Sequence, residues 1–273
     1  MKKLATYLLL LTAGILLLPA SIALADDPLA AQVDESIKAT ADAERPGCPV
    51  LPGWLIDLSA GYWMNRGNSD TQNLLARAAV IKKFEDTWEM IGKGEYAWGK
   101  NKNKTDETYE QTADRGQVSA QANLFVIEDG FLYGRSEYSY DKIKDLNRRW
   151  DSGVGVGYNV YRSGENFLSA EAGVTYIDSR FKYDQSDHGL YLRLAENGAV
   201  KINERVTFLE SLEYKPKFKD LNDYLLTAEA ALRVSLFSNV YFQFTLTDRY
   251  DSNPANGTKS NDLSVIASLG ASF

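Results

Sequence analysis

The sequence predicts an all-β fold, a transmembrane antiparallel up-and-down β-barrel of twelve strands. Three observations predict it: a secretory leader, successive segments with period-two alternation, and connections that alternate between short and long. The last segment is the clearest, because Leu263, Val265, Ala267, Leu269 and Ala271 alternate with mostly small or hydroxylated residues. This pattern is typical of a strand between hydrocarbon and a polar interior, whereas the alternative is an edge strand of a soluble sandwich.

The N-terminal region predicts export and divides the chain into three parts. Residues 1–3 carry two lysines, residues 8–18 are almost wholly apolar, and residues 23–25 read Ala-Leu-Ala. These features predict a removed signal peptide over residues 1–25. The proline-containing stretch 26–53 is predicted to be a flexible periplasmic tail, with a short plug helix as the alternative, and residues 54–273 form the barrel. Cys48 is the sole cysteine and cannot form an intrachain disulfide.

Alternating segments separated by turn residues define the strands. The eighth has the weakest alternation. The predicted strands are 54–63, 71–84, 87–99, 117–126, 131–141, 150–160, 168–176, 190–202, 205–215, 226–236, 240–249 and 262–273.

Loop lengths support the barrel independently of the strand pattern. Short connections are predicted at 84–86, 128–130, 163–166, 203–204 and 238–239. Longer ones are predicted at 64–70, 100–114, 142–149, 178–189, 216–222 and 251–260. Strict alternation is expected when both termini are periplasmic and the outer loops are long, and a Greek-key sandwich gives no reason for it.

Aromatic residues are predicted to form one girdle at each membrane interface. The periplasmic girdle would contain Trp54, Trp88, Phe131, Tyr161, Phe167, Phe208, Tyr241, Phe242 and Phe273. The outer girdle would contain Tyr62, Trp63, Trp98, Tyr138, Tyr140, Trp150, Tyr176, Tyr214 and Tyr250.

Composition and motifs argue against several function classes. A net charge of −7 and export disfavour nucleic acid as a partner. His188 is the only histidine, and a serine hydrolase would need it as the base, yet the adjacent Asp187 points to the opposite face of an extended chain. We therefore expect no enzymatic activity, no cofactor and no metal site. The glycine-rich stretch 153–157 is followed by no helix, so we expect it to thin the barrel wall or permit curvature.

The predicted interior carries charges of both signs. This balance disfavours a dedicated channel for acidic sugars, which should show excess arginine. It suits either a salt-bridged, largely closed interior or a narrow, weakly selective pore. The predicted lumen-lining residues are Arg77, Glu89, Lys93, Glu95, Arg135, Glu137, Asp151, Glu171, Glu229, Arg233 and Arg249.

Two glutamates conflict with simple alternation. Glu196 and Glu210 share the predicted lipid face with Leu194, Phe208 and Leu212. A carboxylate near the bilayer midplane is costly, so we expect a bulge or an opposite register to turn both glutamates inward. A functional lipid-facing pair is the alternative.

Basic residues near the outer loops are candidate contacts for lipopolysaccharide phosphates, with ordinary solvated charge as the alternative. The candidates are Lys142, Lys144, Arg148, Arg149, Lys215, Lys217 and Lys219. Outer-membrane lipid would surround the barrel. We also expect the barrel-assembly machinery to bind the C-terminal strand that ends at Phe273.

Two sequence motifs resemble a known family. Leu58-Ser-Ala-Gly-Tyr62 precedes Gly67-Asn-Ser-Asp-Thr71, and Gly153-Val-Gly-Val-Gly-Tyr158 precedes the closing strand at Phe273. With these motifs the chain resembles the salt-induced outer-membrane proteins, a bacterial β-barrel family of unknown molecular function. The resemblance implies a location in the bacterial outer membrane and a link to salt or osmotic stress, but no site residues.

Two function classes remain open. The first is a narrow passive channel for ions or small solutes. The second is a non-conducting structural barrel whose outer loops bind lipopolysaccharide or a partner. Charge balance leans towards the second, and strand number leans towards the first.

Overall fold

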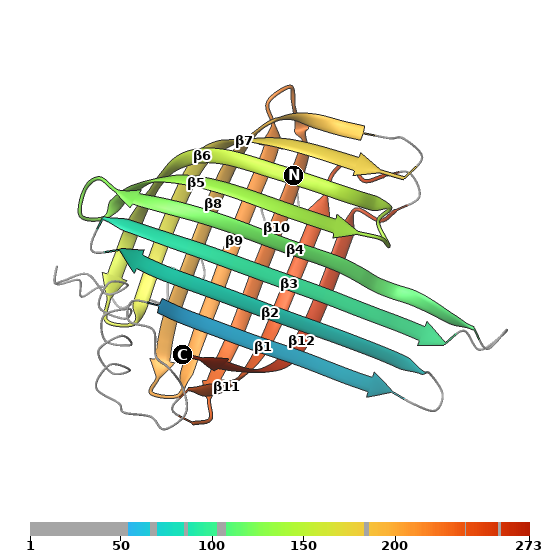
Figure 1. Cartoon of the computed structure of the whole chain (residues 1–273), viewed down its shortest axis with the longest axis horizontal. Coiled ribbons are helices and arrows are strands. Elements are labelled where there is room, and N and C mark those ends of the chain that lie inside the picture. Colours follow the sequence, from blue (N-terminus) through green and yellow to red (C-terminus); the bar gives the residue numbers. More distant parts are fainter. Residues whose placement is uncertain are drawn as a thin grey trace.

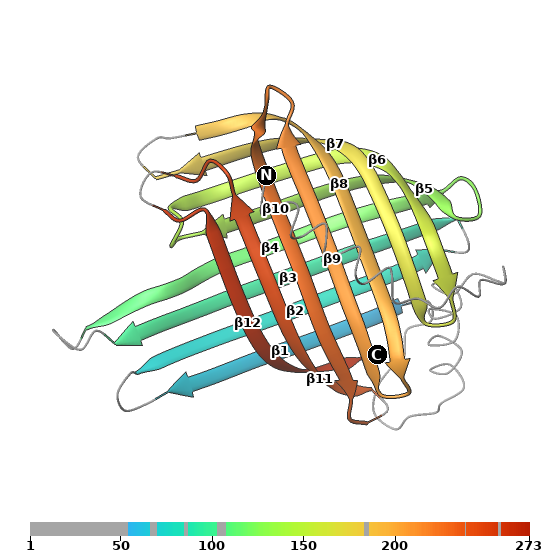
Figure 2. The ribbon, with the colours of Figure 1, turned by 180° about the vertical axis from the view of Figure 1, so that it is seen from behind.

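The computed structural model describes residues 54–65, 70–84, 87–102, 108–182, 186–237, 239–255 and 258–273. The predicted signal peptide, the N-terminal tail and Cys48 lie outside them. The described residues form one closed barrel whose strands follow each other in sequence order (Figures 1 and 2). The strands are β1 (Trp54–Asn65), β2 (Thr71–Phe84), β3 (Trp88–Lys102), β4 (Tyr109–Phe125), β5 (Gly130–Asp141), β6 (Leu146–Ser163), β7 (Asn166–Phe181), β8 (Ser186–Asn203), β9 (Val206–Lys217), β10 (Asp220–Ser235), β11 (Val240–Asp251) and β12 (Asn261–Ser272).

The first and last strands close the barrel. β1 pairs antiparallel with β12, which places Asp57 opposite Ser272 and Ala60 opposite Leu269. Two backbone hydrogen bonds between Ile56 and Phe273, of 2.9 and 2.8 Å, complete the seam. The predicted fold class and the closing role of the C-terminal strand are therefore confirmed, and the soluble-sandwich alternative is excluded.

The strands are longer than the minimum for crossing a bilayer. They contain 12 to 18 residues, whereas about 9–11 tilted residues suffice to span one. In Figure 1 the strands β1 to β5 cross those of the opposite wall at a wide angle. Among the described residues, no helix is long and apolar enough to cross a membrane.

Three of the predicted long loops are short. The predicted loop 178–189 is reduced to the four residues between the end of β7 at Phe181 and the start of β8 at Ser186. Strand β6 begins at Leu146, so residues 142–145 alone connect it to β5. Strands β9 and β10 are joined by residues 218–219 alone. These strand ends resembled loops because they carry charged side chains such as Arg149, Lys215 and Lys217, which face the interior. The alternation of loop lengths is consequently weaker than predicted.

The two faces of the wall have opposite polarity. On β6, Val154 and Val156 are 68% and 55% exposed on the outside, while Asp151 is buried inside. On β11, exposed Phe244 alternates with buried Thr245. An apolar outside around a polar inside is typical of a membrane barrel and is the inverse of a soluble protein.

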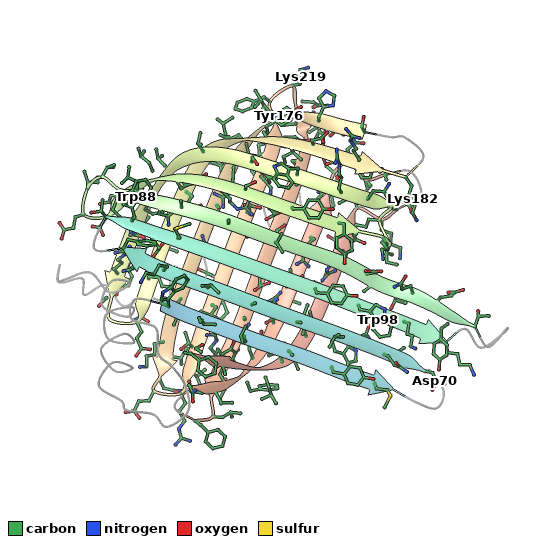
Figure 3. All side chains as sticks on the ribbon, in the orientation of Figure 1. Asp70, Trp88, Trp98, Tyr176, Lys182 and Lys219 are labelled. Carbon is green, nitrogen blue, oxygen red and sulfur yellow. The ribbon has the colours of Figure 1, made fainter. Side chains whose placement is uncertain are left out.

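Figure 3 shows the exposed Trp88 and the half-buried Trp98 towards opposite ends of β3, as two aromatic girdles require. Phe131 and Tyr241, predicted for the periplasmic girdle, are instead buried inside the barrel. Glycines on the facing strand make room for these rings. A Cβ at Gly157 would lie 2.1 Å from the Phe131 ring, and one at Gly270 would lie 2.3 Å from that of Tyr241.

Glu196 and Glu210 face outward, contrary to the prediction. The only register shift between β8 and β9 lies at the periplasmic turn, between Lys201 and Asn203. Beyond this shift Glu196 pairs with Leu212, and Gly198 pairs with Glu210, so alternation is preserved through both glutamates. The free-energy cost of placing these carboxylates towards lipid is therefore not avoided by a shift in strand register.

Candidate functional site in the barrel interior

Ionised side chains inside the barrel form two clusters, and these are the candidate site. The Arg77 cluster joins β2, β3, β4, β10, β11 and β12 and contains Arg77, Glu95, Arg115, Glu229, Arg249 and Asp262. The Glu213 cluster joins β5 to β9 and contains Arg135, Glu137, Asp151, Glu171, Arg193, Glu213 and Lys215.

Arg77 is the centre of the first cluster. Its Nη1 and Nη2 donate to the two carboxylate oxygens of Glu229 at 3.1 and 2.8 Å. Its Nε donates to Glu95 at 2.9 Å. Strands β1, β12 and β11 separate β2 from β10, so the Arg77–Glu229 pair crosses the interior instead of following the wall. This bidentate contact narrows the lumen.

Two further arginines extend the Arg77 cluster. Arg249 Nη2 donates to Glu95 Oε1 at 2.9 Å, from β11 to β3. Arg115 Nη1 donates to Asp262 at 3.0 Å, from β4 to β12. Each of these pairs also links strands that are not neighbours. The cluster therefore ties the first strands of the barrel to the last.

The Glu213 cluster is denser and drier. Arg193 donates to Glu171 at 2.5 Å and to Glu213 at 2.6 Å. Lys215 Nζ lies 2.8 Å from both Glu213 and Asp151. Asp151 is 2% exposed, whereas Glu229 in the other cluster is 29% exposed. The two clusters thus differ chiefly in their access to water.

Interior glycines position the Glu213 cluster. A Cβ at Gly155 or Gly173 would lie 2.6 or 2.3 Å from the Tyr133 hydroxyl. With no Cβ there, Tyr133 lies over the wall of β6 and β7, and its hydroxyl accepts a hydrogen bond from Arg193 at 3.0 Å. The glycines that were expected to thin the wall therefore make space for a ring that fixes an arginine.

Lys93 stands between the two clusters. It faces the interior from β3, opposite the small residues Ala79 and Ser119, and its side chain is exposed. It interacts electrostatically with Arg135, Glu171 and Glu213 of one cluster and with Glu229 of the other. Within the described ranges it forms no ion pair. Its exposure marks water-accessible space inside the barrel.

The other predicted lumen residues also lie inside. Asn123 donates to Glu89 at 2.9 Å, and both side chains are buried. Arg233 lies 3.2 Å from Asp57 and stacks on the Tyr241 ring. Every residue predicted to line the lumen is thereby placed on the inner face, either in a cluster or beside one.

Sequence reasoning missed several charged residues of the interior. These are Asp57, Arg115, Arg193, Glu213 and Asp262. The signal for Arg193 and Glu213 was present, because both alternate with outward leucines on their strands. This signal was overlooked because Glu196 and Glu210, on the same two strands, did not fit a lipid-facing pattern.

Three of the predicted lipopolysaccharide contacts face the interior. Lys215 is buried in the Glu213 cluster, and Lys217 pairs with Asp187 at 2.5 Å and Asp223 at 3.2 Å. Arg149 donates to Ser179 at 2.9 Å. The prediction placed Arg149 and Lys217 in outer loops and Lys215 at the end of a strand. All three belong to strands whose inner face is charged.

Four candidates remain near the outer rim. Lys142 pairs with Asp114 at 2.7 Å, and this hydrogen bond raises the pKa of the lysine. Lys144 lies 3.9 Å from Asp262, and Arg148 lies 3.8 Å from Asp178. Lys219 is exposed in the connection between β9 and β10 (Figure 3).

The described residues show no catalytic arrangement around the single histidine. His188 lies on β8, not in a loop, and is exposed on the outside. Asp187 faces inside, where it binds Lys217 and Tyr191. No group of three or more histidine, cysteine or acidic residues suited to a metal ion occurs in the described part of the chain.

A family model matches residues 58–273, and its description is a protein of unknown function, DUF481. The chain belongs to the DUF481 family. The match spans almost the whole barrel, and it agrees with the membership in a family of unknown function that the motifs indicated. No curated protein matches the chain significantly.

Several solved barrels are similar to the DUF481 chain at low identity. The NanC porin has a TM-score of 0.48 at 10% identity, over 80% of this chain and 98% of that one. The COG4313 outer membrane channel from Pseudomonas putida F1 has 0.48 at 9%, over 85% and 100%. The translocator domain of the autotransporter NalP from Neisseria meningitidis has 0.45 at 11%, over 90% and 95%.

Proposed function

We propose that this DUF481 barrel is a narrow, weakly selective passive channel for ions or small solutes in the bacterial outer membrane. The observation that supports it is Lys93, an exposed lysine that faces the interior between two ion-pair clusters. A packed interior would bury this side chain or pair it, because an isolated ammonium is costly away from water. The exposed side chain of Lys93 therefore favours water-accessible space in this part of the lumen, which a channel requires.

The two ion-pair clusters explain why the proposed channel would be narrow and weakly selective. Pairs that cross the interior leave only part of its cross-section free. The Arg77 cluster contains equal numbers of cations and carboxylates. The Glu213 cluster has one carboxylate in excess, which Lys93 compensates. A nearly neutral lumen gives little preference for either sign of ion.

A link to salt stress would follow from the wetter cluster. Added salt screens exposed ion pairs more than buried ones. High ionic strength would therefore loosen the Arg77 cluster first and widen the path past Lys93. We propose this as the way in which the barrel responds to salt.

The alternative is a non-conducting envelope barrel, and the dense Glu213 cluster is the observation that favours it. The outer rim of such a barrel would bind lipopolysaccharide through exposed basic side chains such as Lys142, Arg148 and Lys219. In either case we propose that the barrel-assembly machinery binds β12 and the terminal Phe273.

Single-channel recording of the refolded protein in planar bilayers, across a salt gradient, tests the channel. We expect reproducible steps and a small reversal potential. Lys93→Glu should shift the reversal potential towards the equilibrium potential of the cation, because the lumen becomes net negative and favours cations. Lys219→Glu, at the rim, is the matched control and should shift it less. Silence from protein shown to be folded and inserted would support the non-conducting alternative.

A further inference from the structure

An apolar groove lies on the outer surface of the barrel, and conduction through the lumen would not involve it. Its volume is about 800 Å³. Its floor is formed by Ala170 and Ala172 of β7, and its sides by larger residues of β6, β8 and β9 such as Tyr158, Leu194 and Leu212. Small residues between two ridges produce the hollow.

One glutamate lines this groove, and a second lies beside the first. Glu196 lines it, and its Oε1 is buried without a hydrogen-bond partner within the described residues. Glu210 follows from β9, where its Oε1 lies 3.1 Å from the position of a Cβ on Gly198. The two carboxylates interact electrostatically with each other. A buried carboxylate oxygen without a hydrogen-bond partner is unfavourable, so Oε1 of Glu196 calls for a donor from outside the chain.

The position within the membrane restricts the donor. Glu210 is two residues from Phe208, on the periplasmic side of the apolar band. At about 3.3 Å per residue along a tilted strand, that places the carboxylate roughly 5 Å inside the periplasmic aromatic level. The headgroup of a membrane lipid can reach the carboxylate over that distance, while an acyl chain of the same lipid fills the groove.

We propose that this groove binds a glycerophospholipid of the periplasmic leaflet with a primary-amine headgroup. One acyl chain lies over Ala170 and Ala172, and the ammonium donates hydrogen bonds to Glu196 and Glu210. Charge complementarity supports an amine over an anionic headgroup, because two carboxylates would repel the latter. The site is independent of conduction through the lumen.

Native mass spectrometry of the refolded barrel with lipids added singly tests the proposal. The lipids are phosphatidylethanolamine, phosphatidylglycerol and phosphatidylcholine, whose quaternary ammonium cannot donate a hydrogen bond. We expect ethanolamine lipid to be retained about ten-fold more than either of the others, as one charge-assisted hydrogen bond would give. Glu196→Gln combined with Glu210→Gln should abolish the preference.

Two matched controls separate the site from general effects. Glu204→Gln removes an exposed carboxylate in the turn of the same hairpin and should leave the preference intact. Ala172→Leu fills the groove and should reduce retention, whereas Ala120→Leu changes an equally exposed alanine on β4 and should not. Heat-modifiable mobility on gels confirms that each variant is folded.

Equal retention of the three lipids by the unaltered barrel would overturn the proposal. So would a preference that survives the double substitution. Retention of a protein subunit in place of lipid, lost on the same substitutions, would assign the groove to a protein and also overturn it.

Discussion

The two interior clusters use the same chemistry in different surroundings. In the Glu213 cluster, Asp151, Arg193 and Lys215 are almost completely buried, and each carboxylate depends on its cationic neighbours. In the Arg77 cluster, Glu229 and Asp262 are about one third exposed at 29% and 33%, so water shares the solvation. The difference indicates that water has less access to the β5–β9 side of the interior than to the Arg77 side.

The largest expected effect is loss of one cation from the dry cluster. Arg193→Met leaves Glu171 without its ion-pair partner and removes one of the cations at Glu213, which should lower the free energy of unfolding by about 3–5 kcal/mol. Urea unfolding in detergent micelles measures it. A loss no greater than that of an exposed pair would show that water reaches this cluster too.

Loss of the central arginine from the wetter cluster should cost less. Arg77→Met should lower the unfolding free energy by about 1–3 kcal/mol, because water can solvate the released Glu229. The same variant should raise single-channel conductance, since a pair that crosses the lumen is removed. Unchanged conductance with a measurable loss of stability would place this pair outside the conducting path.

Ionic strength should affect the stability contributions of the two clusters differently. The stability difference between the parent and Arg77→Met should shrink as ionic strength rises from 0.1 to about 1 M, where the Debye length falls to about 3 Å. The difference for Arg193→Met should change little. Parallel urea titrations at the two salt concentrations check this, and equal salt slopes would remove the distinction.

The smallest effect is expected at the outer rim. Arg148 lies 3.8 Å from Asp178, and the two side chains are 46% and 32% exposed. Arg148→Met should change the unfolding free energy by less than about 1 kcal/mol, as is typical of exposed pairs. A larger loss would mean that the rim pair is ordered more strongly than its exposure suggests.

Alternation predicted most of the fold because both faces of a barrel strand have strict requirements. It placed Arg77, Glu95 and Glu229 inside, yet it could not show that Arg77 meets Glu229, because that contact depends on barrel diameter and strand tilt. Alternation also placed Glu196 outside correctly, and the argument from desolvation cost was wrong there. Strand ends such as Lys215 were missed because an inward charge and a loop charge look alike in sequence.

The seam between β1 and β12 has consequences for how the barrel forms. Every other pairing joins consecutive strands through a connection that is short compared with the chain, while the seam joins Asp57 to Ser272. It pairs Asp57–Ala60 with β12, whereas β1 and β2 pair from Trp54 to Asn65. Such a distant contact carries the largest loop-closure entropy cost, so we expect it to form last. Before it forms, the paired strands would be an open sheet with two unpaired edges. The last few residues of the polypeptide thus decide when a sheet becomes a barrel.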